Sequence, residues 1–457
     1  MTVREVNKVL PYFQTSNISE TNNLIIAVSV WVARRLGLKR QRQTWTAHPE
    51  PWWKRRIERD IKELQRSINL MTRHKNGEVK SREKIKKLYE KFSIPRKGIG
   101  TVLEELKQRV LAKKAKIDRY TERLQQYRQN RLFNYDQKRL YSELNGNNRV
   151  ANEIPNAEES RVFWNGIWGE SKEHNYNAEW LKTLKDNFRY RNQEGLVITE
   201  ENVLKQSRKV PNWKAPGKDG VQGFWVKKLT SLHERIAHQL NEILRGNEQL
   251  PEWLTYGRTV LCQKDITKGT AVDNYRPISC LPIMWKLFTG IMSDYLHDFL
   301  EEEKLLPEEQ KGCRRKTRGT KDQLLIDKAV LKDCKRRYTD LAMAWVDYRK
   351  AYDMIPHSWI RECLELFGAA DNIKSVLSSS MKNWKLELTS SGVSLDVVNI
   401  KRGIFQGDSL SPLLFVICMI PLTMVLRKVN FHYELGNKVT KLNNLLFMDD
   451  LKLFAVS

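Results

Sequence analysis

Cysteine, long apolar runs and acidic residues are scarce in this sequence of 457 residues, and each scarcity excludes a class of protein. The six cysteines are dispersed, no two lie at a zinc-knuckle spacing, and no histidine cluster accompanies them. We therefore expect reduced, mostly packed thiols in an intracellular protein. The longest apolar run near the start, residues 24–32, is too short to span a membrane, and it lacks a signal-peptide pattern. No membrane partner is expected.

The scarcity of acidic residues is uneven along the chain. Lys and Arg number 80 against 54 Asp and Glu, which gives a net charge of +26. Residues 1–150 hold 35 of the basic and only 15 of the acidic side chains, so most of the excess lies there. A basic segment of this kind favours a polyanionic partner through phosphate neutralisation and counterion release. The alternative, a solvated helical surface, would more often mix the two signs.

Apolar spacing predicts an all-helical region early in the chain, without repeats or low-complexity tracts. Helices are expected over about residues 57–70, 82–92, 101–128 and 130–144. The third of these helices has an apolar stripe, and its other faces carry basic residues. We interpret residues 51–145 as a basic helical extension that binds nucleic acid. A coiled-coil-like spacer is the alternative, which the unsustained apolar heptads weaken.

The segments on either side of this extension are less informative. Residues 1–50 carry no clear signal and form a poorly defined N-terminal segment. Residues 146–204 combine a linker with an aromatic segment that includes Phe163, Trp164 and Trp168. For these aromatic side chains, packing is the expected role rather than chemistry.

Two adjacent carboxylates, Asp449 and Asp450, stand between apolar runs, which predicts a β-hairpin with the acids in its turn. Neighbouring carboxylates repel each other, and a divalent cation would neutralise them. The alternative is a solvated turn. A second apolar run, residues 341–346, ends in Asp347 and predicts a buried strand. A strand that delivers a carboxylate beside such a hairpin is how a two-metal phosphoryl-transfer site is assembled, with the ions ~3.5–4 Å apart.

Several ordered segments resemble a reverse transcriptase of the non-LTR (LINE-type) retrotransposon branch. They are Tyr275-Arg276-Pro277-Ile278-Ser279, Asp347 to Asp353, Arg402-Gly403-Ile404-Phe405-Gln406-Gly407-Asp408-Ser409-Leu410-Ser411-Pro412 and Phe447-Met448-Asp449-Asp450. The upstream element Trp213 to Gly220 also fits that branch. The resemblance covers about residues 205–457 and implies the fold of a right-hand polymerase. We expect α+β architecture, with helical fingers and an antiparallel palm sheet that carries helices.

Local patterns in residues 205–457 are compatible with that fold. Helices are expected over about residues 229–244, 283–300, 321–331 and 413–425, and a hairpin over 385–400. The second of these helices is expected to be amphipathic. Asp353 is expected to cap the turn that follows it.

The resemblance and the side-chain chemistry together assign the metal and nucleotide contacts. Asp347 and Asp449 would bridge two Mg²⁺ or Mn²⁺ ions, and Asp450 would assist. Arg276, in a rigid turn before proline, would bind the triphosphate of the incoming nucleotide, with Lys264 a weaker candidate. The alternative for Arg276 is an ion pair within the fingers.

Further contacts come from Tyr352, Gln406 and Gly407. The resemblance implies that Tyr352 packs under the sugar and collides with a ribose 2′-OH, which selects dNTPs; the alternative is a core tyrosine. Glycine at 407 allows the backbone to approach a base pair, and the Gln406 amide would sense the template or the nucleotide. Template contacts are assigned to loop residues, with plain surface loops as the alternative. These residues are Lys214, Lys218, Arg314 and Arg315.

The sequence thus predicts an RNA-directed DNA polymerase of a non-LTR retrotransposon, acting in target-primed reverse transcription at a nuclear integration site. Its partners would be an RNA template, a DNA primer or target, and dNTPs. An RNA-dependent RNA polymerase shares the carboxylates, but Tyr352 argues against it.

Two features depart from the family pattern. Met448 stands where the branch more usually has Ala, which bears on fidelity more than on activity. The chain ends at Ser457, soon after the carboxylate hairpin, so we expect the later palm segments and the thumb to be missing. The alternative function is therefore a truncated, inactive element product that binds RNA or DNA through its basic helices.

Overall fold

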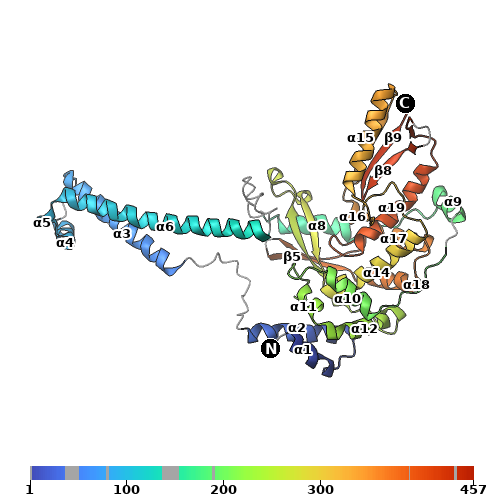
Figure 1. Cartoon of the computed structure of the whole chain (residues 1–457), viewed down its shortest axis with the longest axis horizontal. Helices are drawn as coiled ribbons and strands as arrows, with labels where there is room; N and C mark the ends of the chain where they lie inside the picture. The colour runs from blue at the N-terminus through green and yellow to red at the C-terminus, as the bar shows by residue number, and fades with distance from the viewer. Residues whose placement is uncertain are drawn as a thin grey trace. The chain divides into compact units, whose positions relative to one another are not determined.

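A computed structural model of the chain describes most of its residues in two units (Figure 1). The described residues are 3–36, 51–78, 82–135, 154–187, 191–390, 392–436 and 440–456. One unit comprises residues 1–38 and 151–457, and the other comprises residues 39–150. The expected linker before residue 154 lies outside the described residues.

The smaller unit is helical, as the apolar spacing predicts. Its helices are α3 (Trp52–Lys75), α4 (Arg82–Phe92), α5 (Ile94–Lys97) and α6 (Ile99–Tyr135). Trp53, at the start of α3, makes an edge-on ring contact with Tyr120 late in α6. Met71, near the end of α3, shares a small core with Leu106 early in α6. The two helices therefore run antiparallel.

One helix boundary in this unit differs from the prediction. The sequence predicts a separate helix over residues 130–144. Its predicted start is wrong, because α6 continues without a break to Tyr135. The remainder of that segment lies outside the described residues. The helical run breaks in this region, as expected, but it does so at Ser93 and Gly98, which both have a positive φ; Pro95 lies in the first turn of α5 and does not break it.

The first residues of the chain belong to the larger unit, although no clear pattern marked them in the sequence. They form α1 (Val3–Val9), η1 (Leu10–Tyr12) and α2 (Ile18–Arg35). The side chain of Asn17 accepts a hydrogen bond from the backbone of Glu20, which caps the N-terminus of α2. Thr21 on α2 then donates a hydrogen bond of 2.8 Å to the buried side chain of Gln239.

Many further helices follow α2 in the larger unit. They are α8 (Ala157–Trp168), α9 (Glu179–Asn187), α10 (Glu200–Lys209), α11 (Gly223–Lys228), η2 (Thr230–Leu232), α12 (His233–Arg245), α13 (Glu252–Thr255), η3 (Ile266–Lys268), η4 (Val272–Asn274), α14 (Ile283–Glu302), α15 (Thr320–Arg337), α16 (Ala351–Met354), α17 (His357–Leu366), α18 (Asp371–Met381) and α19 (Ser411–Arg427). Helix α14 is not simply amphipathic, because 13 of its 20 residues are buried. No helix among the described residues is both long and apolar enough to cross a membrane.

A four-stranded mixed sheet lies in this unit, with the strand order β2-β1-β4-β5. Its strands are β1 (Tyr256–Gln263), β2 (Tyr275–Cys280), β4 (Lys385–Ser390) and β5 (Val393–Asn399). Strand β1 pairs with β2 antiparallel and with β4 parallel. The predicted rigid turn at Arg276 and Pro277 is wrong, since both residues lie in β2. Proline is tolerated there because β2 is an edge strand.

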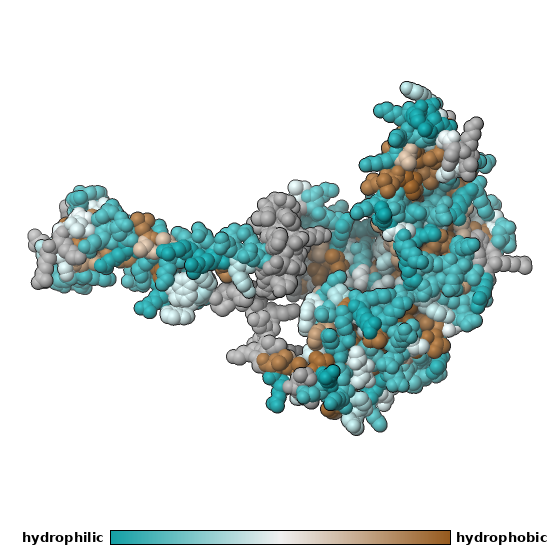
Figure 2. Space-filling view, viewed as in Figure 1, coloured by the Kyte–Doolittle hydropathy of each residue, from teal (hydrophilic) through white to brown (hydrophobic). Residues whose placement is uncertain are grey.

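A second, antiparallel sheet has the order β3-β9-β8. It consists of β3 (Ala342–Val346), β8 (Asn444–Phe447) and β9 (Asp450–Ala455). The expected buried strand is wrong here, because β3 is an edge strand and its Trp345 is 68% exposed. An apolar run alone does not show whether another layer covers it. Figure 2 shows hydrophobic residues at the surface over α15 and this sheet, where Leu324 and Leu325 are also exposed.

A short antiparallel ribbon completes the described strands. It joins β6 (Tyr433–Glu434) to β7 (Lys441–Leu442). Tyr433 is buried with Val330 of α15 and Phe454 of β9, in a small core separate from the main one. The α+β class is thus confirmed.

Candidate active site

Strand pairing brings three carboxylates to one end of the three-stranded sheet. Val346 at the end of β3 lies opposite Leu451 of β9, so Asp347 follows beside the start of β9, where Asp450 stands. Phe447 pairs with Asp450 and closes the hairpin around Met448 and Asp449. The predicted hairpin is confirmed, with Asp449 in its turn and Asp450 as the first residue of β9.

The electrostatics of Asp449 fit a cation site. Burial raises the pKa of Asp449, the negative charges of Asp450 and Asp347 raise it further, and Arg276 opposes them. The carboxylates are therefore close enough to repel each other. Carboxylate oxygens are the ligands that Mg²⁺ and Mn²⁺ prefer, so Asp347, Asp449 and Asp450 fit a divalent ion.

A cavity of about 690 Å³ opens beside these carboxylates. Asp347 and Asp449 line it. The structure brings to the same cavity every residue that the sequence assigned to the nucleotide. These are Arg276, Lys264, Tyr352, Gln406 and Gly407.

The aromatic wall of the cavity is held by stacking. The Tyr352 ring lies 4.7 Å from the ring of Phe415 on α19, with an interplanar angle of 4°. Burial raises the pKa of Tyr352, so its hydroxyl stays neutral. The ring is therefore a fixed, uncharged surface of the cavity.

The prediction that Asp353 caps a turn is wrong. Asp353 is buried, with only 2% of its surface exposed. It accepts a hydrogen bond of 3.2 Å from the Trp168 indole and bonds of 3.1 and 3.2 Å from the Gln406 amide. Burial raises the pKa of Asp353 to about 6. These bonds fix the orientation of the Gln406 side chain in the cavity wall.

Gly407 is needed where the Gln406 segment meets β2. Its φ is +121°, and a Cβ there would lie 2.7 Å from the carbonyl oxygen of Ser279. The Ser279 amide donates to the Gln406 carbonyl oxygen at 2.7 Å. This close approach places Gln406 beside the strand that carries Arg276.

Sequence reasoning missed Lys350, which also lines the cavity. Its ammonium lies 4.3 Å from the Trp164 ring centroid and 5.1 Å from that of Phe163, both on α8. Burial, and then the charge of Lys264, lower the pKa of Lys350 to about 8. A lysine between Asp347 and Tyr352 was the only hint of this role in the sequence.

Helix α8 packs against the cavity from outside the segment that the sequence assigned to the polymerase. It lies beside β5 (Figure 1). Besides the Trp168 bond to Asp353, the Arg402 guanidinium donates to the carbonyl oxygens of Ile167 and, at 2.7 Å, Gly166. The aromatic segment does pack, as expected, and what it packs against is the cavity wall.

The residues assigned to the template lie outside this cavity. Lys214 lines a smaller neighbouring cavity together with Gly407. Lys218 forms an ion pair of 2.8 Å with Glu387 and lies over the ring of Tyr256. The Arg314 guanidinium donates to two backbone carbonyl oxygens of its own loop.

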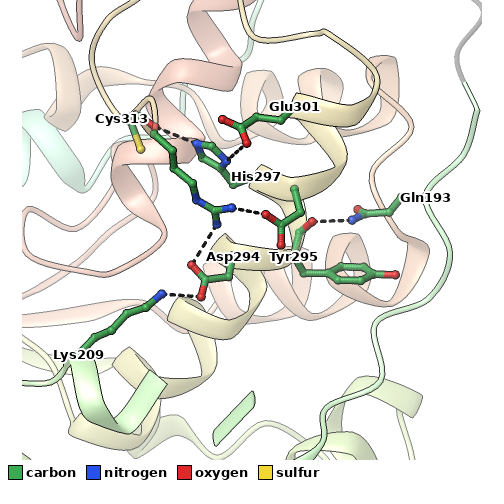
Figure 3. A network of polar contacts seen from close by, with 9 residues as sticks. Gln193, Lys209, Asp294, Tyr295, His297, Glu301 and Cys313 are labelled. Atoms are coloured by element: carbon green, nitrogen blue, oxygen red, sulfur yellow. Dashed lines mark hydrogen bonds and ion pairs between the residues drawn. The ribbon is translucent and has the colours of Figure 1, made fainter. Parts of the chain in front are cut away.

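Arg315 is held by α14 in the network of Figure 3. Its guanidinium pairs with Asp298 and, at 3.3 Å, with Asp294, which also pairs with Lys209. His297 hydrogen-bonds the carbonyl oxygen of Cys313 at 3.1 Å. In this structure Arg315 therefore ties its loop to α14.

An α+β unit whose sheet brings three carboxylates together, two of them lining a cavity with basic side chains, is an arrangement typical of nucleic-acid polymerases. Residues 266–457 match the family described as reverse transcriptase (RNA-dependent DNA polymerase). This part of the chain is similar to that family, and the expected resemblance to non-LTR retrotransposon enzymes is confirmed by the relatives.

Three relatives illustrate the similarity. The Retrovirus-related Pol polyprotein from type-2 retrotransposable element R2DM of Drosophila melanogaster is 27% identical over 57% of this chain and 23% of its own length. A corresponding polyprotein from element R2 of Popillia japonica is 30% identical over 45% of this chain and 28% of its own. The RNA-directed DNA polymerase from mobile element jockey of D. melanogaster is 24% identical over 56% of this chain and 28% of its own length. The chain spans about a quarter of the length of these relatives.

Proposed function

We propose that this chain is an RNA-directed DNA polymerase that extends a DNA primer on an RNA template. The observation that carries the proposal is the convergence of Asp347 and Asp449 with Arg276 on one cavity. We further propose that it acts in target-primed reverse transcription, at a nuclear integration site.

Asp347, Asp449 and Asp450 would hold two Mg²⁺ or Mn²⁺ ions, which supply Lewis-acid activation of the primer hydroxyl and charge neutralisation at the triphosphate. Cationic side chains in the same cavity bind the triphosphate oxygens, and the planar guanidinium of Arg276 is suited to paired contacts. Lys264 and Lys350 add charge to that wall.

Selection of the sugar is assigned to Tyr352. Its ring cannot turn aside easily, because it is stacked on Phe415. A ribose 2′-hydroxyl directed at this ring would collide with it, so dNTPs are preferred. Gln406, held by Asp353, and Gly407 form the part of the wall assigned to the base pair.

Primer extension on an RNA template tests the proposal. The wild-type chain should extend a DNA primer with dNTPs in Mg²⁺ or Mn²⁺, and Asp449→Ala should abolish extension. Asp340→Ala is the matched control, because it removes an exposed carboxylate just before β3. Extension that survives in Asp347→Ala or Asp449→Ala would contradict the assignment.

The same assay separates a reverse transcriptase from an RNA polymerase. Tyr352→Ala should improve ribonucleotide use by roughly 10- to 100-fold, the range of steric discrimination in enzyme pockets. Tyr352→Phe keeps the ring and should keep the discrimination. A wild-type chain that prefers ribonucleotides would favour the RNA polymerase.

The basic helices are proposed to bind the nucleic acid backbone. On α6 the exposed basic side chains include Lys114, Lys116 and Arg119. Replacing all three by Gln in the full chain should reduce the salt dependence of RNA binding by about one slope unit per lost phosphate contact. Glu122→Gln on the same helix is the control and should not reduce it.

The runner-up function is a binding protein without polymerase activity. RNA binding that is tight and salt-dependent, together with no primer extension under any of these conditions, would favour it.

A further inference from the structure

The carboxylate turn, Met448 and Asp449, has an unusual backbone. Met448 has a φ of +57°, in the left-handed region that residues with a side chain seldom adopt. Such a conformation persists only where the surroundings hold it. Asp449 is the next residue, so the direction in which its carboxylate leaves the hairpin depends on Met448.

A single buried side chain binds both backbone polar groups of Met448. The Oε1 atom of Gln310 accepts from the Met448 amide at 2.9 Å, and its Nε2 atom donates to the Met448 carbonyl oxygen at 3.2 Å. The same Oε1 atom accepts from the Gly312 amide at 2.8 Å. Gln310 is only 2% exposed, so these bonds are made away from water.

The segment that carries Gln310 is itself fixed against β8. The Leu446 amide donates to the Glu309 carbonyl oxygen, and the Lys311 amide donates to the Leu446 carbonyl oxygen, each at 3.0 Å. The side-chain Nε2 of Gln323 donates to both of those carbonyl oxygens, at 2.9 and 2.7 Å. The Glu309 side chain forms paired bonds of 2.9 and 2.6 Å with Arg427.

Close packing leaves little freedom on the other side of the turn. A Cβ at Gly312 would lie 2.5 Å from the sulfur of Met448, so glycine at 312 allows this side chain its position. Gln310, Gly312 and Met448 therefore form one packed, hydrogen-bonded group.

We propose that Gln310 is a positioning residue for the carboxylate turn. It holds Met448 in the left-handed conformation and thereby directs Asp449 into the cavity that Asp347 also lines. The catalytic consequence rests on the proposed polymerase function, whereas the hold on the turn does not.

Gln310→Leu tests the inference, because leucine fills the volume without either hydrogen bond. Gln239→Leu is the matched control: Gln239 is also 2% exposed and bonds to Thr21 and Thr15, remote in sequence from the hairpin. Three measurements are made on the full chain. They are hydrogen exchange of the peptide that spans residues 446–451, thermal unfolding, and kcat and KM for dNTPs.

In Gln310→Leu we expect exchange in that peptide to rise at least 10-fold and kcat to fall at least 10-fold. The KM for dNTPs should stay within about threefold, because Arg276 and Tyr352 are not disturbed. Gln239→Leu should lower the unfolding temperature without either effect. Met448→Gly, added to Gln310→Leu, should recover part of kcat, because glycine adopts a positive φ unaided.

Gln310→Glu is the second variant, because its carboxylate form keeps the shape and both accepted bonds but cannot donate to the Met448 carbonyl oxygen. Its exchange rate should lie between those of wild type and Gln310→Leu. If hydrogen exchange is unchanged in both variants, Gln310 does not fix the conformation of the turn. If exchange increases while kcat is unchanged, the conformation of the turn does not affect catalysis. A wild-type chain that extends no primer would count against the proposed function, and exchange alone would then decide whether Gln310 holds the turn.

Discussion

Gly403 permits a close approach between two segments of the cavity wall, and replacing it with alanine has a calculable cost. Its φ is +86°, and a Cβ there would lie 2.6 Å from the carbonyl oxygen and 2.8 Å from the carbonyl carbon of Asp353. The next amide, of Ile404, donates to the Tyr352 carbonyl oxygen at 2.9 Å. Gly403→Ala should therefore displace the backbone that carries Tyr352 and Asp353.

Two costs add in this variant. A side chain at positive φ costs about 1–2 kcal/mol. The contact with backbone atoms adds about 1–3 kcal/mol, the usual cost of overpacking. Alanine lowers the conformational entropy of the unfolded chain relative to glycine, which offsets about 0.4–1 kcal/mol of these costs. We expect Gly403→Ala to lower the free energy of unfolding by about 1–4.5 kcal/mol in total, with the middle of the range near 3 kcal/mol.

Gly392, in the turn between β4 and β5, provides the control. Its φ is +84°, nearly the same, but a Cβ added there would meet no atom within 4 Å. Gly392→Ala therefore incurs the backbone cost alone, about 1 kcal/mol. Urea unfolding followed by tryptophan fluorescence measures both variants, and the KM for dNTPs should rise only in Gly403→Ala. Equal destabilisation of the two variants would refute the reasoning.

Three further changes probe the groups around the cavity. Trp168→Phe removes the hydrogen-bond donor to the buried Asp353 carboxylate and should lower the free energy of unfolding by about 1–3 kcal/mol at pH 7.5. The loss should be smaller at pH 5, because the Asp353 carboxyl, with a pKa of about 6, is mostly protonated there. A similar cost at both pH values would contradict this. Burial lowers the pKa of His357 to about 4, so the unfolded chain binds the proton first and stability falls as the pH drops from 6.5 towards 4. His357→Gln should remove about 2 kcal/mol of that loss at pH 5, measured as the difference in urea unfolding between pH 7 and pH 5. Burial disfavours the charged form of Lys350, with its pKa lowered to about 8, so wild-type stability should rise between pH 8 and 10.5. Lys350→Met should gain about 1 kcal/mol at pH 7, after allowance for partial exposure, and raise the KM for dNTPs at least 10-fold; an unchanged KM would exclude Lys350 from the triphosphate contacts.

Much of the fold was predictable because it depends on local patterns. The carboxylate hairpin and the β4–β5 hairpin follow from apolar runs that flank a polar or glycine-containing turn. The helices of the basic unit follow from their apolar spacing. The exposure of β3 did not follow, because an apolar run shows that a strand forms and not whether another layer covers it. Pro277 likewise suggested a turn, because strand order, and hence an edge position, is not visible in sequence.

The location of the candidate site was predictable where a residue type suggests its own chemistry. The three carboxylates, which the sheet brings together, and Arg276, which lines the cavity, are of this kind, and their roles stay predictions. Asp353 was misread because its partners, Trp168 and Gln406, lie far away in sequence. Lys350 was missed for a similar reason, since its contact with the rings of α8 exists only in the folded chain.

The start of the segment that matches the family does not coincide with a boundary of folding. The segment that matches the family begins at residue 266, just after β1, yet β1 is the strand that joins β2 to β4. A fragment cut at that point would lose the middle of the sheet that carries Arg276. It would also lose α8, and with it the indole that binds Asp353 and the carbonyl groups that bind Arg402. For this chain, the smallest piece worth expressing is set by these contacts and includes residues well upstream of the recognisable family segment.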